Sequence, residues 1–135
     1  MELRSPEKAR GVTRRFLGNC QAVSTDTIDT AILIVSELVT NAYYAMAENA
    51  NGILGIDLSL RWFNNQRLLI EVADSSPLAP VLAASGPDAV NGRGLSLVDE
   101  LSQQWGFFWH CGRKIVYAVV STADASNSAS AWGQS

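Results

Sequence analysis

The longest helical pattern in the chain runs from Ile28 to Met46. Apolar residues recur there at spacings of four and three, which places them along one side of a helix. This stripe consists of Ile28, Ile32, Val35, Val39, Ala42 and Met46. Residues 24–26 are Ser-Thr-Asp, which are candidate N-caps, and residues 49–52 are Asn-Ala-Asn-Gly, which suit a helix end. The pattern therefore predicts one long helix that is buried along one side.

Shorter patterns flank this helix. Ser5-Pro6-Glu7 predicts the start of a first helix, which we expect to end near residue 22, because serine caps and proline suits the first turn. Apolar and polar residues alternate over 54–62 and again over 67–74, which is typical of strands with one buried face. The polar residues 64–66 lie between these strands and predict a turn, so the two strands should form an antiparallel hairpin.

The second half of the chain predicts a loop, a helix and another hairpin. Residues 75–91 are small and include Pro and Gly, and they form a longer loop than most compact domains have. The apolar spacing after Gly94 predicts a short helix marked by Leu95, Val98 and Leu101. Residues 107–111 and 115–120 should form the second hairpin, turned at Gly112-Arg113.

Helices and strands are therefore grouped along the chain, which predicts an α+β fold. We expect a two-layer α/β sandwich, with helices packed on one face of a mixed, mostly antiparallel sheet. The 135 residues suffice for one domain, and 47% of them are hydrophobic, so we expect a packed core. We assign this domain to residues 1–121 and predict that the polar tail 122–135 is disordered.

Composition narrows the function classes. The net charge of −3 gives no general case for nucleic-acid binding. Five of the ten basic residues stand in the first fifteen positions, and a solvated helix face explains them better than a basic contact patch. No apolar run is long enough to cross a membrane and no signal peptide is visible, so we expect a cytoplasmic protein.

The cysteines and the single histidine indicate packing more than chemistry. Cys20 and Cys111 stand in no metal-ligand spacing, so we expect two free thiols in the core. His110 lies in an aromatic segment, where a packed strand residue is a better hypothesis than a catalytic one. One histidine leaves no basis for a histidine-based zinc site.

Three polar features could carry chemistry. Glu37 and Asn41 are one helical turn apart and share a face, which is either a solvated face or a site for a metal or phosphoryl group. Gly92-Arg93-Gly94 opens the third predicted helix, so it is either a plain turn or a place where backbone N–H groups meet phosphates. Asp74 ends a strand, and its carboxylate either closes a turn or accepts a hydrogen bond from an exocyclic amine such as that of adenine.

The order of these features resembles a known family. Residues 35–42, VSELVTNA, are similar to the N box of the histidine-kinase-like ATPase superfamily, which includes DNA gyrase and sensor histidine kinases. Residues 71–77, EVADSSP, and 92–99, GRGLSLVD, are similar to its first and second glycine boxes. Trp105-Gly106 and a final strand over 114–120 agree with the family's ending. The resemblance covers roughly residues 8–121 and is strongest to the small bacterial anti-sigma-factor serine kinases of the actinobacterial type.

The resemblance implies a Bergerat-type ATP-binding fold and a set of site residues. Asn41 would bind Mg²⁺, and Glu37 would orient or activate the attacking hydroxyl. Asp74 would bind the adenine amino group of ATP. Gly92, Arg93, Gly94 and Leu95 would surround the phosphates, under a lid formed by residues 75–91.

The chain also departs from the family pattern. Ser75-Ser76-Pro77 replaces the usual glycines after Asp74, and neither Tyr44 nor Ala45 matches the histidine that often follows the N box. A threonine often begins the last strand and supports the adenine-binding Asp, and our alignment places Ile115 there.

Two functions follow from the resemblance. The first is a Mg-ATP-dependent serine/threonine kinase that phosphorylates an anti-anti-sigma protein, sequesters a sigma factor and forms a homodimer through its N-terminal helices. The second is a regulatory module of the same fold that binds partners with weak or no kinase activity. A histidine-kinase catalytic domain is a weaker alternative, because the chain has no dimerisation helix carrying a phosphorylatable histidine.

Overall fold

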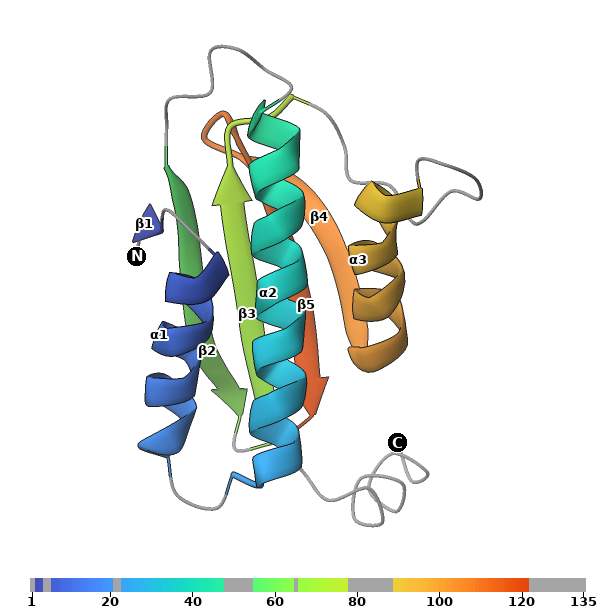
Figure 1. Ribbon diagram of the computed structural model, residues 1–135. Helices are drawn as coiled ribbons and strands as arrows, with labels where there is room; N and C mark the ends of the chain where they lie inside the picture. The colour runs from blue at the N-terminus through green and yellow to red at the C-terminus, as the bar shows by residue number, and fades with distance from the viewer. Residues whose placement is uncertain are drawn as a thin grey trace.

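The computed structural model describes residues 2–3, 6–20, 23–47, 55–64, 66–77 and 89–121. Its helices are α1 (Pro6–Gly18), α2 (Thr25–Ala47) and α3 (Ala89–Leu101). Its strands are β1 (Glu2–Leu3), β2 (Ile56–Asn64), β3 (Arg67–Asp74), β4 (Gln104–His110) and β5 (Arg113–Ser121). The helices cover one face of the sheet in a second layer (Figure 1), so the predicted α+β, two-layer arrangement is confirmed.

The sheet has the strand order β1-β2-β3-β5-β4. All four pairings among these described strands are antiparallel, so the expected mixed sheet is wrong in that detail. Strands β2 and β3 form the predicted antiparallel hairpin, which has a bulge between Trp62 and Asn64. Strand β1 was not predicted, because two residues are too few to show alternation.

The stripe of α2 packs as predicted against the inner face of the sheet. Val35, Val39 and Ala42 are buried, and the apolar residues of β2 and β3 meet them from the other layer. Helix α1 packs beside α2 and reaches β2, where the rings of Phe16 and Trp62 stack with centroids 6.4 Å apart. Each such apolar side chain contributes roughly 1.5–3 kcal/mol when it is fully buried. The core therefore fixes α2 over the middle of the sheet.

The helix termini follow the predicted chemistry in part. The Ser24 hydroxyl accepts a hydrogen bond from the Thr27 N–H at 3.1 Å, which confirms Ser24 as the cap of α2. Helix α1 begins at Pro6 as predicted but ends at Gly18, before the expected residue 22. Helix α2 runs to Ala47, and its predicted stop at residues 49–52 lies outside the described residues.

The β4–β5 hairpin corrects three predictions. It turns at Cys111-Gly112, one residue earlier than expected, with φ of 52° and 76°, as the hairpin turn of type I′ requires. This turn puts Cys111 in solvent, and His110 beside it is also exposed, so neither is a core residue. Cys20 is half-buried, and both cysteines are free.

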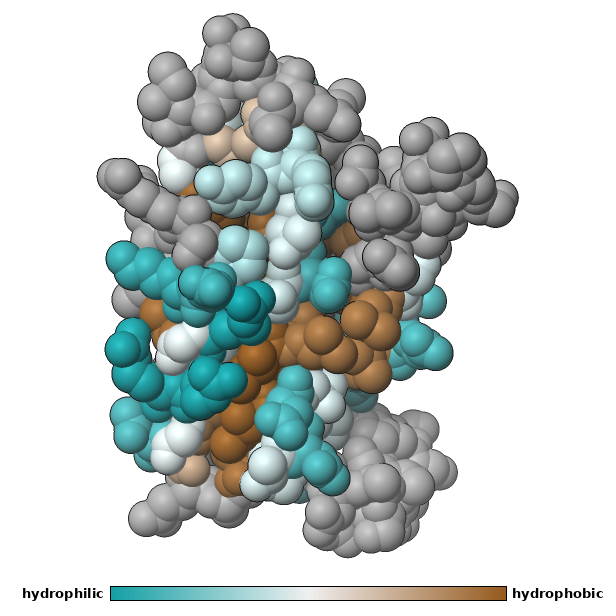
Figure 2. All heavy atoms as spheres, viewed as in Figure 1, coloured by the Kyte–Doolittle hydropathy of each residue, from teal (hydrophilic) through white to brown (hydrophobic). Residues whose placement is uncertain are grey.

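The helical face of the molecule separates polar from apolar residues (Figure 2). Hydrophilic side chains gather over α1, where Lys8, Arg14 and Arg15 are exposed as expected of a solvated helix face. Within the described ranges, none of the helices combines the length and apolar character that crossing a membrane would require. The predicted tail 122–135 and most of the predicted loop, residues 78–88, lie outside the described residues.

Candidate functional site

Four chain segments meet at one end of the sheet, the upper end in Figure 1. Helix α2 and strand β3 both end there, whereas β5 and α3 both begin there. This arrangement follows from the antiparallel β3–β5 pairing, because the end of β3 must lie beside the start of β5. The topology therefore brings Asn41, Asp74 and the start of α3 to the same end of the molecule.

Asp74 is the most unusual residue at this end. Its side chain has no solvent exposure, although aspartate is almost never fully buried unless it is paired. The Ser76 N–H donates a hydrogen bond to Asp74 Oδ1 at 2.7 Å, a local turn of the kind that aspartate favours. Asp74 Oδ2 has no hydrogen-bond partner among the described residues and lies 3.5 Å from Lys114 Nζ. Asp74 thus closes a turn with one oxygen and leaves the other available as an acceptor.

Burial raises the pKa of Asp74 above 3.8, because desolvation penalises the ionised carboxylate. The hydrogen bond from Ser76, the charge and the close side-chain contact of Lys114, and the weaker influence of Arg113 each lower the pKa and offset part of that effect. The 3.5 Å separation of Asp74 Oδ2 and Lys114 Nζ suits an ion pair but is longer than a normal N–H···O hydrogen bond. Asp74 is thus an acid held in a low-dielectric site beside one cation.

Lys114 was missed in the sequence analysis. It is directly opposite Asp74 in the β3–β5 register, and only 1% of its surface is exposed. The position assigned to Ile115 is corrected by the same register: Ile115 is opposite Ala73 and so points to the other face of the sheet. The signal was present, because Lys114 shares its strand parity with the buried Val116 and Ala118.

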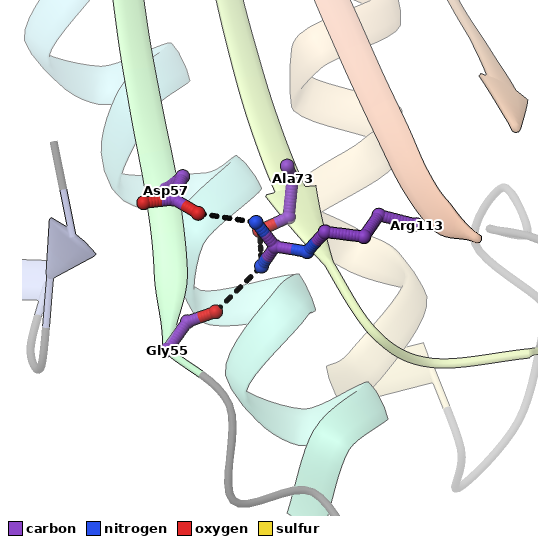
Figure 3. Close-up of polar contacts among 4 residues, drawn as sticks. All are labelled: Gly55, Asp57, Ala73 and Arg113. Atoms are coloured by element: carbon purple, nitrogen blue, oxygen red, sulfur yellow. Dashed lines mark hydrogen bonds and ion pairs between the residues drawn. The ribbon is translucent and has the colours of Figure 1, made fainter. Parts of the chain in front are cut away.

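Arg113 fixes the same end of the sheet from the outer face (Figure 3). Its guanidinium donates to the Asp57 carboxylate and to the carbonyl oxygens of Gly55, at 2.7 Å, and Ala73, at 3.3 Å. These contacts join the start of β5 to β2 and to β3 one residue before Asp74. Arg113 was predicted only as a turn residue, because its partners lie 40 to 58 positions away in the sequence.

Glu37 and Asn41 are both half-buried on α2, unlike the exposed Tyr43 and Tyr44. They are therefore less solvated than an outer helix face would be. The neighbouring Ser36 accepts a hydrogen bond from Arg10 at 3.0 Å, which ties this part of α2 to α1. Among the described residues, no hydrogen bond or ion pair joins Glu37 or Asn41 to Asp74. The structure thus places Asn41 at the same end of the molecule as Asp74 but without a hydrogen bond between the two side chains.

Residues 92–94 lie in a different place from the one predicted. Helix α3 begins at Ala89, so residues 92–94 lie within the helix rather than before it. The free N–H groups of a helix belong to its first four residues, which here include Gly92 but not Gly94. Leu95 is fully buried, and its side chain belongs to the apolar core.

Two further observations concern metal ligands and surface hollows. Among the described residues no three His, Cys, Asp or Glu side chains gather into a group that could hold a metal ion. A surface hollow lined by Thr27, Thr30 and Gln103 lies at the opposite end of the sheet, away from Asp74.

Compared with known proteins, the sequence matches no family model and no curated protein.

Proposed function

We propose that this protein is a Mg-ATP-binding regulatory serine/threonine kinase of the anti-sigma-factor type with a Bergerat-type fold. The observation that carries the proposal is the buried Asp74 carboxylate, whose Oδ2 has no hydrogen-bond donor among the described residues. A buried acceptor without a donor is costly, and an amino group of a bound base would satisfy it. The order of the N box and the two glycine boxes supports the same assignment.

The resemblance supplies the proposed roles of the individual residues. Asp74 accepts a hydrogen bond from the adenine amine, and Asn41 supplies a side-chain oxygen to the metal. Glu37, one turn earlier on α2, orients the attacking hydroxyl. ATP with Mg²⁺ supplies the phosphoryl group and neutralises its charge. The free N–H groups of the first turn of α3 face the phosphates in this proposal.

The proposed partners are an anti-anti-sigma protein, which receives the phosphate on serine, and a sigma factor, which the domain holds. We also propose a homodimer through the N-terminal helices, which sedimentation velocity tests directly. A monomer at all concentrations would reject the dimer and leave nucleotide binding untouched.

The second candidate is a partner-binding module with weak or no kinase activity. The observation that favours it is the absence of Lys and Arg from residues 75 to 92, since charge on the transferred phosphate then depends on Arg93. The two candidates share the nucleotide site and differ only in phosphoryl transfer.

Calorimetric titration with Mg-ATP tests the shared claim. We expect binding in the micromolar to millimolar range that Asn41→Ala weakens and that depends on Mg²⁺. Absence of binding by the wild type would reject both nucleotide-dependent candidates.

Transfer of labelled phosphate separates the two candidates. The wild type is incubated with labelled ATP and anti-anti-sigma proteins encoded beside its gene, with Glu37→Gln as the variant. The kinase proposal expects label on the partner with the wild type and strongly reduced label with Glu37→Gln. ATP binding without transfer to any partner would favour the binding module.

A further inference from the structure

The ion pair of Lys114 and Asp74 is buried, which is energetically unfavourable for a lysine. Lys114 points to the helix-covered face of the sheet, beside the buried Val116, and is 1% exposed. Removing an ammonium and a carboxylate from water costs more than their mutual attraction often returns. Pairing alone is therefore a weak reason for a lysine at this position, where the strand pattern otherwise places Val and Ala.

The pair offers one acceptor and one donor side by side. Asp74 Oδ1 already accepts from Ser76, so Oδ2 is the acceptor that points away from the turn. An ammonium carries three N–H donors and no acceptor, so Lys114 can keep its present contacts and still direct one N–H to a ligand. The two atoms are 3.5 Å apart, close enough to reach neighbouring atoms of one flat heterocycle.

We propose that Lys114 is a specificity-determining residue that reads the base of the nucleotide together with Asp74. Adenine presents an exocyclic amine, which donates, next to ring nitrogen N1, which accepts. Asp74 Oδ2 accepts from the amine and Lys114 Nζ donates to N1. This inference rests on the proposed nucleotide binding and assigns the second half of base recognition to a residue of this chain.

The burial of the pair gives the contact its selectivity. A charged donor in a low-dielectric site forms a stronger hydrogen bond than a neutral donor in water. A base without an acceptor at N1 places a C–H group where one ammonium N–H would otherwise donate, and a site built to hydrogen-bond a ligand discriminates against an analogue that lacks the matching group. Both side chains are buried in the structure, so the proposal requires a local opening that admits the base.

The test compares ATP with 1-deaza-ATP, in which a C–H replaces N1, by calorimetric titration in Mg²⁺. We expect wild-type protein to bind 1-deaza-ATP about tenfold or more weakly than ATP. Purine riboside triphosphate, which lacks the amine, tests the Asp74 contact in the same series and should also bind more weakly. Equal affinity of the wild type for ATP and 1-deaza-ATP would overturn the role of Lys114 while leaving ATP binding intact. No binding of any of these nucleotides would instead reject the proposed function and this inference with it.

Lys114→Met provides the second arm. Methionine retains a long apolar stem without the donor, so the variant should bind ATP and 1-deaza-ATP equally and still discriminate against purine riboside triphosphate. The chain has one other lysine, the exposed Lys8, and Lys8→Met is the matched control that should behave as the wild type. Retained discrimination by folded Lys114→Met would overturn the proposal. If that variant does not fold, the analogue series on the wild type decides alone.

Discussion

Two adjacent residues of β5 form ion pairs with aspartates on opposite faces of the same sheet. Lys114 lies on the helix-covered face beside Asp74, and both side chains are at most 1% exposed. Arg113 lies on the outer face beside Asp57, and these side chains are 28% and 42% exposed. Two basic–acidic pairs thus begin at consecutive residues of β5 and lie on opposite faces of the sheet.

The two pairs differ in burial and in the number of groups that they join. Arg113 donates to a carboxylate and two backbone carbonyls and so joins three strand ends, although its Nε is buried without a hydrogen bond among the described residues. Asp74 is fully buried, and its Oδ2 has no hydrogen bond among the described residues. The outer pair therefore has a direct structural role, whereas we propose that the inner pair also serves a ligand. Variants of the two pairs should accordingly differ in size and in kind.

The largest effect should come from Asp74→Ala. Removal of one partner from a buried ion pair leaves the other charge uncompensated, and we expect the free energy of unfolding to fall by about 3 kcal/mol. Urea denaturation of the wild type and the variant measures this loss. The double variant Asp74→Leu with Lys114→Met should recover most of the stability, because apolar side chains replace both charges. A loss below about 1 kcal/mol for Asp74→Ala would indicate that the inner pair is as solvated as a surface pair.

Arg113→Met should have an intermediate effect of about 1–2 kcal/mol, because the variant keeps the stem but loses hydrogen bonds from a partly exposed charged donor. The same urea denaturation applies. Asp57→Ala in the Arg113→Met background should add little, since the partner is already lost. Full additivity of the two changes would contradict a direct Arg113–Asp57 interaction.

Gly106→Ala tests the packing of the outer face. A Cβ at Gly106 would approach the Tyr117 hydroxyl oxygen to 2.8 Å, so the ring that covers the glycine must move. We expect a loss of about 1 kcal/mol in the free energy of unfolding, as for mild overpacking. The control is the same change in a Tyr117→Ala background, where the loss should disappear. An equal loss in both backgrounds would assign the effect to the strand backbone rather than to the ring.

The smallest effect should be a pH dependence that belongs to the inner pair. The pKa of Asp74 is raised in the folded protein, so between 3.8 and that raised pKa the folded state binds more protons than the unfolded state. Stability due to Asp74 is therefore greatest at low pH and falls as pH rises through this interval. Ser76 and Lys114 offset part of the shift, which keeps the effect small. Urea denaturation of the wild type and Asp74→Asn across this range measures the effect. A wild type that becomes more stable relative to Asp74→Asn as pH rises would contradict the expected direction.

Local patterns were enough to predict the α+β, two-layer arrangement. The stripe on α2 and the alternation in β2 and β3 show the helix and strand periods within each element, and the Ser24 cap is a local hydrogen bond. The partners of Arg113 and Lys114 were not predictable in the same way, because they depend on the strand order β3-β5. A lysine at a buried strand position was nevertheless a readable sign of a buried charge.

The start of α3 shows why the sequence did not place the proposed phosphate-binding residues correctly. Glycines often precede a helix, so Gly92 and Gly94 were read as its opening, yet the helix continues through them from Ala89. Helix boundaries are the least certain part of any sequence-based reading, since a residue of low helix propensity can still lie inside a first turn. The order of the motifs could be seen in the sequence, whereas the position of Gly92 and Gly94 within α3 could be seen only in the structure.

The central claim is that the buried Asp74 carboxylate binds the adenine base of ATP. Titration of Mg-ATP into the wild-type protein and into Asp74→Asn tests this claim most directly. The wild type should bind, and Asp74→Asn, confirmed as folded by circular dichroism, should bind about tenfold to a hundredfold more weakly through loss of a charge-assisted hydrogen bond. Lys8→Met serves as the control with unchanged affinity. Equal binding by the wild type and Asp74→Asn, or no binding by either, would contradict the account.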